Sequence, residues 1–206
     1  MIYWPTEYRT WALQEELIKN CLAFETLAFG RSIDFYQQTK TRKPLAIISF
    51  DIVLKKANYL VFKKGTKNKR NFEDYILFDF DRSINLKQLE NLRVGGLDIL
   101  GRENMEALLV KALHANVEFV RVAKIEDILP LINFDYADIA LVSKTHLKSL
   151  KALTERPLMI TDAKMKLSLP FVGIKDNTPK TQQMVQQCLD KISTKAKEIF
   201  GVDEWK

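Results

Sequence analysis

The chain has 206 residues, of which 47% are hydrophobic and 28% are charged. This composition is typical of a globular protein with a buried core, and it excludes a disordered or collagen-like chain. Lysine and arginine (32 residues) exceed aspartate and glutamate (26 residues), which gives a net charge of +6. The excess is spread along the chain, and its one dense run, residues 63–70, is interpreted as a solvated turn. The charge therefore does not favour a nucleic-acid partner.

The sequence contains none of the common motifs for chemistry or targeting. Residues 1–7 lack the pattern of a secretory signal peptide, and no stretch approaches the roughly 20 apolar residues of a membrane-spanning helix. Glycine-rich phosphate loops, nucleophile-elbow serines and clustered metal ligands are also missing, so we predict no catalytic residue, no metal and no cofactor. Cys21 and Cys188 are interpreted as two buried thiols in preference to a single disulfide bond.

The first third of the chain suggests a helix followed by a strand and a long extended segment. Thr6 is a candidate cap for the helix, which leads to a predicted strand at residues 21–24. Two extended segments, 47–62 and 167–174, are interpreted as crossings between two lobes. In that arrangement the two ends of the chain form one lobe and the middle forms the other, although a single domain remains possible.

The middle of the chain alternates strands with helices. The clearest helix follows Gly101 and lies between predicted strands at 92–96 and 117–122. A second helix begins near Ile125 and should be distorted or ended by Pro130. It leads to a continuously apolar strand at 137–142, typical of a strand buried on both faces. This order predicts an α/β protein with parallel strands.

The last helix is predicted to start at Asn177-Thr178-Pro179, with the proline in its first turn. Beyond it, apolar residues recur at helical spacing and form one stripe, namely Met184, Val185, Cys188, Leu189 and Ile192.

The order of several segments matches a known family. These segments are 21–26 followed by Gly30-Arg31, 39–45, 58–65, 86–95, 135–140 and 170–177. Together they resemble the bacterial periplasmic solute-binding proteins of the amino-acid-binding type. The resemblance implies an α/β, bilobal type 2 periplasmic-binding fold, whose two lobes are joined by two crossing strands. Residues 1–59 and 169–206 would form the first lobe, which would be truncated and lack its opening strand and helix, and residues 60–168 would form the second.

The function implied by this resemblance is capture of a small solute between the lobes, without catalysis. The protein would act outside the cytoplasm, in the periplasm, and would deliver its solute to the membrane permease of an ABC-type transporter or to a sensor. No nucleic acid and no cofactor would take part, and the chain would not be embedded in the membrane.

Four polar residues fall at ligand-binding positions of the family. Arg31 corresponds to the guanidinium that binds a ligand carboxylate, and Thr26 to a group that assists it. Arg102 lies at a helix N-terminus that would face an anion, although the family has small hydroxyl residues there. Ser143 occupies the position of an ammonium-binding carboxylate. Since a buried ammonium needs a counter-charge, we expect an anionic solute and not a standard α-amino acid.

Aromatic residues near the expected site are Trp4, Tyr8 and Phe24, which could form an apolar wall or belong to the core. Two other functions stay open. One is an enzyme on the same fold, dehydratase-like, for which Glu25 is the best acid-base candidate. The other is the effector-binding domain of a LysR-type regulator.

Overall fold

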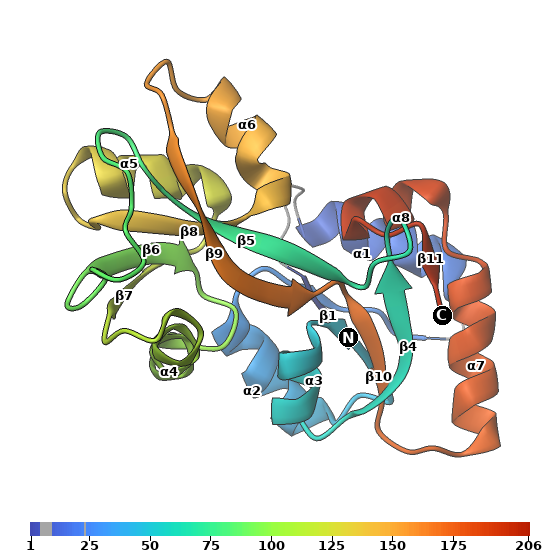
Figure 1. The fold of residues 1–206 in the computed structure, drawn as a ribbon. Coiled ribbons are helices and arrows are strands. Elements are labelled where there is room, and N and C mark those ends of the chain that lie inside the picture. The colour runs from blue at the N-terminus through green and yellow to red at the C-terminus, as the bar shows by residue number, and fades with distance from the viewer. Residues whose placement is uncertain (5–9, 23) are drawn as a thin grey trace. The chain divides into compact units, whose positions relative to one another are not determined.

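The computed structural model describes residues 1–4, 10–22 and 24–206, and its ribbon is drawn in Figure 1. The chain divides into two compact units. The first consists of residues 1–72 and 168–206, and the second of residues 73–167. The second unit is therefore a continuous insertion in the first, and the chain passes between the two units twice. Each unit contains its own sheet.

The first unit is built from two separate stretches of chain. Its strands are β1 (Ile2–Tyr3), β2 (Ala28–Phe29), β3 (Ala46–Ser49), β4 (Leu60–Thr66), β10 (Phe171–Ile174) and β11 (Glu204–Trp205). Its helices are α1 (Thr10–Asn20), α2 (Ser32–Arg42), α3 (Asp51–Lys56), α7 (Pro179–Asp190) and α8 (Thr194–Phe200). The six strands lie in the order β11-β4-β10-β3-β1-β2. Strand β1 is parallel to β2 and β3, whereas β10 is antiparallel to β3 and β4.

The start of this unit differs from the sequence-based expectation. The predicted lobe lacks its opening strand, whereas in the structure β1 lies between β3 and β2. Helix α1, which follows β1, is the helix that the sequence predicts before residue 21. Ile2 is paired with both Ala28 and Ile48. A strand of two residues shows no alternation of apolar and polar side chains, so its sequence gives no pattern to recognise. Strand β4 also belongs to this unit, since it pairs with β10 and β11.

The predicted strand at residues 21–24 is wrong. The Cys21 N–H donates to the Leu17 carbonyl at 2.8 Å, and the Phe24 N–H donates to the Cys21 carbonyl at 2.9 Å. These bonds end α1 in a turn, and the 85% exposed side chain of Leu22 has no sheet to pack against. The parallel strand that follows α1 is instead the short β2. The proposed cap, Thr6, lies outside the described residues.

The two faces of the first sheet are covered by different helices. Gly173 in β10 faces α3, because an added Cβ would come within 2.9 Å of both Leu54 and Tyr59. The neighbouring residue Val172 points to the opposite face, since successive strand residues alternate. There it lines a cavity together with residues of α7, including Val185.

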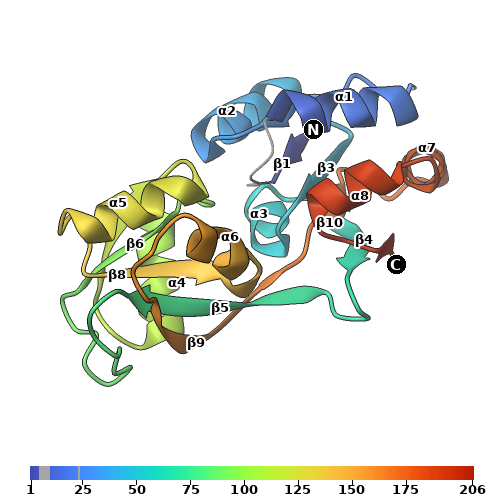
Figure 2. The ribbon, with the colours of Figure 1, turned by 90° about the horizontal axis from the view of Figure 1, so that it is seen from above.

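The second unit contains the other sheet. Its strands are β5 (Phe72–Asp79), β6 (Arg93–Leu97), β7 (Glu118–Val122), β8 (Ile139–Ser143) and β9 (Met159–Ser168). Its helices are α4 (Arg102–Leu113), α5 (Ile128–Asn133) and α6 (Leu147–Ala152), with two 3-10 turns, η1 (Ile125–Asp127) and η2 (Lys144–His146). The strand order is β7-β6-β8-β5-β9, in which β6 is parallel to β7 and β8, and β5 is antiparallel to β8. Figures 1 and 2 show α4 on one face and α5 and α6 on the other.

Most elements predicted for this part of the chain are confirmed. Helix α4 and its flanking strands β6 and β7 lie where the periodicity placed them, and every residue of β8 is buried. Pro130 does not end its helix. It is the third residue of α5, and the N–H groups of a first helical turn have no intrahelical partner to lose.

Helix α7 also begins as predicted, with Pro179 as its first residue and the Thr178 hydroxyl accepting from the Thr181 N–H at 3.3 Å. Within the described residues, no helix combines the length and apolar character needed to cross a bilayer.

Candidate functional site

One polar site lies at the end of β8 in the second unit. Ligands of open α/β sheets bind beyond the carboxyl ends of parallel strands, and Ser143 is the last residue of β8. Because β5 runs antiparallel to β8, the start of β5 lies beside this end, with Tyr75 paired to Ser143. Glu73, near the start of β5, is thereby brought to the same edge. The turn η2 continues directly from Ser143 and adds Thr145.

These side chains form a hydrogen-bonded cluster. Ser143 is only 3% exposed, and its hydroxyl donates to Glu73 Oε2 at 2.6 Å. The Thr145 hydroxyl lies 2.8 Å from the Ser143 hydroxyl and 3.4 Å from the same carboxylate oxygen. The sequence predicted a strand end without a carboxylate, but the neighbouring strand supplies one. Glu73 was missed because no feature of the sequence fixes the register between β5 and β8.

A small cavity of about 20 Å³ lies beside this cluster. It is lined by both polar and apolar residues, namely Tyr75, Gly96, Leu97, Ile99, Met105, Leu141, Val142, Ser143, His146, Met165 and Leu167. Burial raises the pKa of Tyr75, so its phenol stays neutral. The volume suits a water molecule and not an organic solute, so a solute would have to bind outside this cavity.

Arg102 and Arg31 both lie on the surface and are paired with acidic side chains. Arg102, the first residue of α4, contacts Glu106 at 3.4 Å and Glu118 at 3.6 Å. Arg31 precedes α2 and donates from Nε and Nη2 to the carboxylate of Asp34, at 2.7 and 3.0 Å. Its side chain is 67% exposed. The ion pair with Asp34 raises the pKa of Arg31 and occupies the Nε and Nη2 groups of its guanidinium.

The other predicted contacts lie in the first unit. Phe24 and Thr26 line a cavity of about 520 Å³ within this unit. Trp4 does not line it, because its ring is buried against Phe50 with centroids 4.4 Å apart. Tyr8 lies outside the described residues. The structure therefore brings Phe24 and Thr26 together, whereas Arg31 and Trp4 lie elsewhere in the unit.

A disulfide bond between Cys21 and Cys188 forms part of the same cavity wall. It joins the end of α1 to α7, with the two Cα atoms 4.7 Å apart. This corrects the interpretation of the cysteines as two buried thiols. The two residues are separated by 167 positions, so only the fold shows that they are neighbours.

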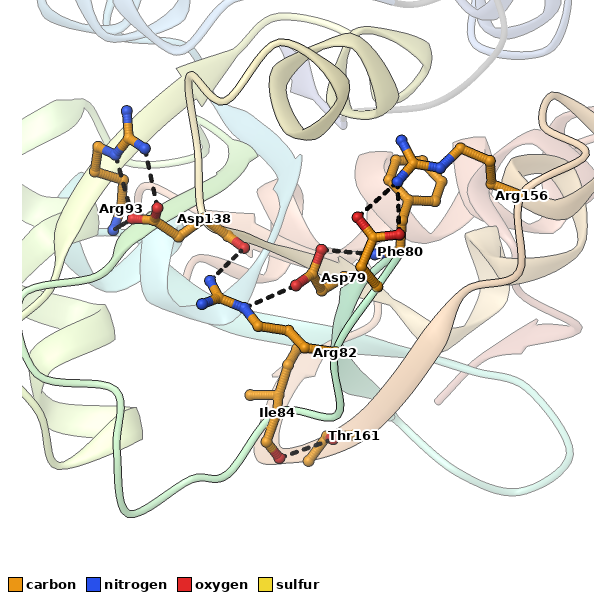
Figure 3. A network of polar contacts seen from close by, with 9 residues as sticks. Asp79, Phe80, Arg82, Ile84, Arg93, Asp138, Arg156 and Thr161 are labelled. Carbon is orange, nitrogen blue, oxygen red and sulfur yellow. Dashed lines mark hydrogen bonds and ion pairs between the residues drawn. The ribbon is translucent and has the colours of Figure 1, made fainter.

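An ion-pair network lies at the opposite end of the second sheet and is drawn in Figure 3. Asp138, just before β8, accepts hydrogen bonds from the Arg93 N–H at 2.7 Å and from its guanidinium at 2.9 and 3.2 Å. Arg82 donates to Asp79 at 2.8 Å and to the Asp138 carbonyl at 3.3 Å. These bonds link the ends of β5, β6 and β8. We therefore assign the network a structural role.

The same network extends to the loop before β9. Arg156 makes two hydrogen bonds of 2.8 Å to Asp81 and lies over the ring of Phe80, 4.2 Å from its centroid. The Thr161 hydroxyl donates to the Ile84 carbonyl at 3.1 Å. The first contact joins the loop before β9, and the second joins β9 itself, to the segment that follows β5. Among the described residues, no group of three or more histidine, cysteine or acidic side chains is arranged to hold a metal ion.

Comparison with known proteins identifies the fold. No protein-family model matches the chain, and no curated protein is similar to it in sequence. Many solved structures are similar to it in three dimensions, and they share the type 2 periplasmic-binding fold predicted from the sequence.

Three of these structures cover nearly the whole chain. XAC2383 from Xanthomonas citri bound to ATP has a TM-score of 0.71 at 8% identity, covering 100% of this chain and 89% of that one. A putative L-cystine ABC transporter from Listeria monocytogenes has a TM-score of 0.65 at 13% identity, with coverages of 100% and 97%. The GluR0 ligand-binding core from Nostoc punctiforme in complex with L-glutamate has a TM-score of 0.62 at 12% identity, with coverages of 97% and 93%. At these identities the likeness shows the fold alone.

Proposed function

We propose that this chain is a solute-binding protein that captures a small organic solute for an ABC-type transporter or a sensor. The observation that carries the proposal is the fold, in which the second α/β unit is inserted into the first through two crossings of the chain. This is the architecture of proteins that close around a ligand by hinge motion. The similar structures include a transporter component and a ligand-binding core, which supports the same role.

The disulfide bond supports a location outside the cytoplasm. Disulfide bonds form and persist in oxidising compartments such as the bacterial periplasm, and they are rare in the reducing cytosol. The Cys21–Cys188 bond joins two helices of the first unit, so it is part of the fold. A periplasmic protein that hands its solute to a membrane permease fits this chemistry.

The solute is a small organic acid, with or without an amino group. Arg31 is the candidate for its carboxylate, for which the Asp34 carboxylate competes as an internal partner of the guanidinium. The sequence-based argument against an amino acid relied on the lack of an acid at Ser143. Glu73 provides a carboxylate 2.6 Å from that hydroxyl, so this argument no longer excludes an amino acid.

A non-enzymatic role is preferred to catalysis on the same fold. Glu25, the best acid-base candidate in the sequence, is 72% exposed and pairs with Arg42 at 2.9 Å. Catalytic acids and bases are often buried, because burial shifts their pKa toward the value that the reaction needs. An exposed, ion-paired carboxylate lacks this burial. No described feature of Glu25 therefore favours an enzyme.

Thermal unfolding in the presence of organic acids and amino acids tests the proposal. A solute at 100 times its Kd adds about 2.7 kcal/mol to the free energy of unfolding and raises the midpoint temperature. Arg31→Ala should abolish the shift for the solute found. Asp34→Asn should increase it, because the internal carboxylate no longer competes for the guanidinium.

The matched control is Arg156→Ala, which removes an exposed arginine with a similar two-bond carboxylate pair in the second unit. This variant should respond to the solute as the unaltered protein does. If no compound of the panel raises the midpoint of the unaltered protein, the proposed function fails. If the solute stabilises the Arg31→Ala variant equally, the assignment of Arg31 fails.

A further inference from the structure

The cavity in the first unit is large for a unit of this size. Its volume of about 520 Å³ lies within the range of roughly 300–1,000 Å³ found for small-molecule sites. The space is open to solvent on one side, where the exposed side chains of Glu25 and Arg42 form part of its wall. All of its lining residues belong to the first unit, and the cavity therefore exists independently of the second.

Apolar side chains from both helices and strands form most of the wall. They are Ile2, Leu17, Phe24, Leu27, Pro44, Leu45, Ala46, Ile48, Val172, Met184, Val185 and Leu189. Such a surface offers few hydrogen bonds to water, which needs two to four polar partners to be held in a cavity. An apolar molecule of matching size would gain free energy by replacing water there.

The disulfide bond keeps two walls of the cavity at a fixed distance. Cys21 follows the last residue of α1, and Cys188 lies on α7. Both residues line the cavity. Because the bond is covalent, α7 cannot move freely toward or away from α1 at this point. The bond therefore limits how far this part of the wall can move.

The polar part of the wall consists of Thr26, Glu25 and Arg42, and Met1 also lines the cavity. The Met1 amino group donates to the Ala46 carbonyl at 2.8 Å, and burial lowers its pKa to about 5, so it adds no charge near pH 7. The Arg42 guanidinium donates from Nε to Gln38 and from Nη1 to Glu25, both at 2.9 Å. A guanidinium has five N–H groups, so three remain after these two bonds to described residues. Those groups can bind the oxygens of a ligand carboxylate.

The charge around the cavity also favours an anion. A second hollow of about 440 Å³ shares Cys21, Phe24, Met184 and Cys188 with the cavity. Lys19 and Lys191 line this hollow. The charged residues lining the two spaces are thus three basic ones and one acidic one, Lys19, Arg42, Lys191 and Glu25. A local excess of positive charge attracts and orients anionic ligands.

We propose that this cavity binds a small amphiphile with an apolar body and a carboxylate head, such as a medium-chain fatty acid. The apolar body lies against α1, α7 and the sheet, and the carboxylate contacts Arg42 with Thr26 nearby. This site is separate from Arg31 and from the Ser143 cluster, and it does not rest on the proposed function.

Calorimetric titration of the full chain with three ten-carbon probes tests the proposal. Decanoate, decanol and decyltrimethylammonium have similar apolar bodies and differ in head-group charge. We expect one decanoate to bind per chain, weaker binding of decanol, and the weakest binding of the cation. Binding of the three probes with equal affinity, or of several decanoate molecules per chain, would show nonspecific adsorption and overturn the proposal.

Two variants locate the ligand. Met184→Trp fills the cavity from a half-buried position on α7 and should abolish decanoate binding. Val110→Trp, at a 39% exposed position on α4 of the second unit, is its control and should bind normally. Arg42→Gln should weaken decanoate binding about tenfold and leave decanol binding unchanged, since only the charged head loses a partner.

Failure of this proposal is distinguishable from failure of the proposed function. A folded Met184→Trp variant that still binds decanoate with unchanged affinity overturns the cavity site. The same variant should keep its response to the solute found with the organic-acid panel, because that response depends on Arg31. Circular dichroism of each variant establishes that a lost signal is not due to unfolding.

Discussion

The hydrogen bonds of Asp138 stabilise the fold in a way that depends on pH. Its carboxylate accepts the Arg93 main-chain N–H at 2.7 Å and the guanidinium at 2.9 and 3.2 Å, which joins the starts of β8 and β6. The hydrogen bonds from Arg93 hold the pKa of Asp138 below its usual value, although partial burial opposes this shift. A carboxyl with a lowered pKa stabilises the fold above its unfolded pKa of about 3.9, and it loses that effect as the pH falls through the folded pKa.

The Asp138→Asn variant should therefore lose stability near neutral pH. We expect its free energy of unfolding at pH 7 to fall by about 1–3 kcal/mol, because charge-assisted bonds become neutral or are lost. The difference from the unaltered protein should shrink as the pH falls below about 4, because the carboxyl of the unfolded chain is then protonated, and it should disappear only below the lowered pKa of folded Asp138. Urea unfolding at pH 7 and pH 3 measures both effects.

Asp162→Asn is the matched control, since Asp162 also has a lowered pKa, caused by hydrogen bonds from Lys164. Its side chain is 60% exposed, so solvent screens the pair and little change is expected. Equal losses in the two variants, or a difference that does not depend on pH, would contradict the assignment of Asp138.

The sequence predicted where a single residue lies better than it predicted which side chains that residue contacts. The family resemblance drew attention to Ser143, which is the last residue of β8. It did not reveal Glu73 beside Ser143, or Asp34 on Arg31, because those partners depend on strand register and on the side-chain conformation. Local patterns fix where a residue lies on its own element, whereas contacts between elements come from the fold.

Periodicity revealed some of the long helices, but it missed α2 and the shortest strands. Helices α4 and α7 have 12 residues each, enough to show an apolar stripe. Strands β1 and β2 have two residues each, which is too few for any alternation. The disulfide bond was missed for a related reason, since a cysteine pair 167 residues apart gives no spacing pattern.

Loss of the disulfide bond should weaken the first unit strongly. A cross-link that closes such a long loop removes entropy from the unfolded chain, and the chain-entropy relation sets its effect at up to about 5 kcal/mol. The double variant Cys21→Ser/Cys188→Ser should unfold at a lower denaturant concentration, as measured by circular dichroism. The unaltered protein in a reducing agent should show the same shift, and the double variant should not respond to that agent.

If the double variant and the oxidised protein unfold at the same denaturant concentration, the bond does not stabilise the folded unit. In that case the cavity wall formed by α1 and α7 would be held by packing alone. The same pair of proteins then tests the decanoate site, since a wall held only by packing is free to close.

At the scale of the whole chain, the two units differ in how they are assembled. The first unit needs both ends of the chain, whereas the second is one continuous segment, residues 73–167. A continuous hydrophobic cluster within that segment joins β5 and β8 to α5 and α6, with Phe78, Ile128, Ala140 and Leu150 fully buried. A segment with its own core, sheet and continuous chain meets the conditions for independent folding.

The segment 73–167, produced alone, should therefore fold. We expect a cooperative thermal transition and the circular dichroism of a mixed α/β protein, because all five strands and three helices are largely contained in it. Phe78→Ala in this segment, which removes a fully buried ring and costs about 3–5 kcal/mol, should abolish the transition. Ile160→Ala, at a 38% exposed position of β9, is the control and should keep the transition. A segment without any cooperative transition would mean that the core of the second unit depends on the first.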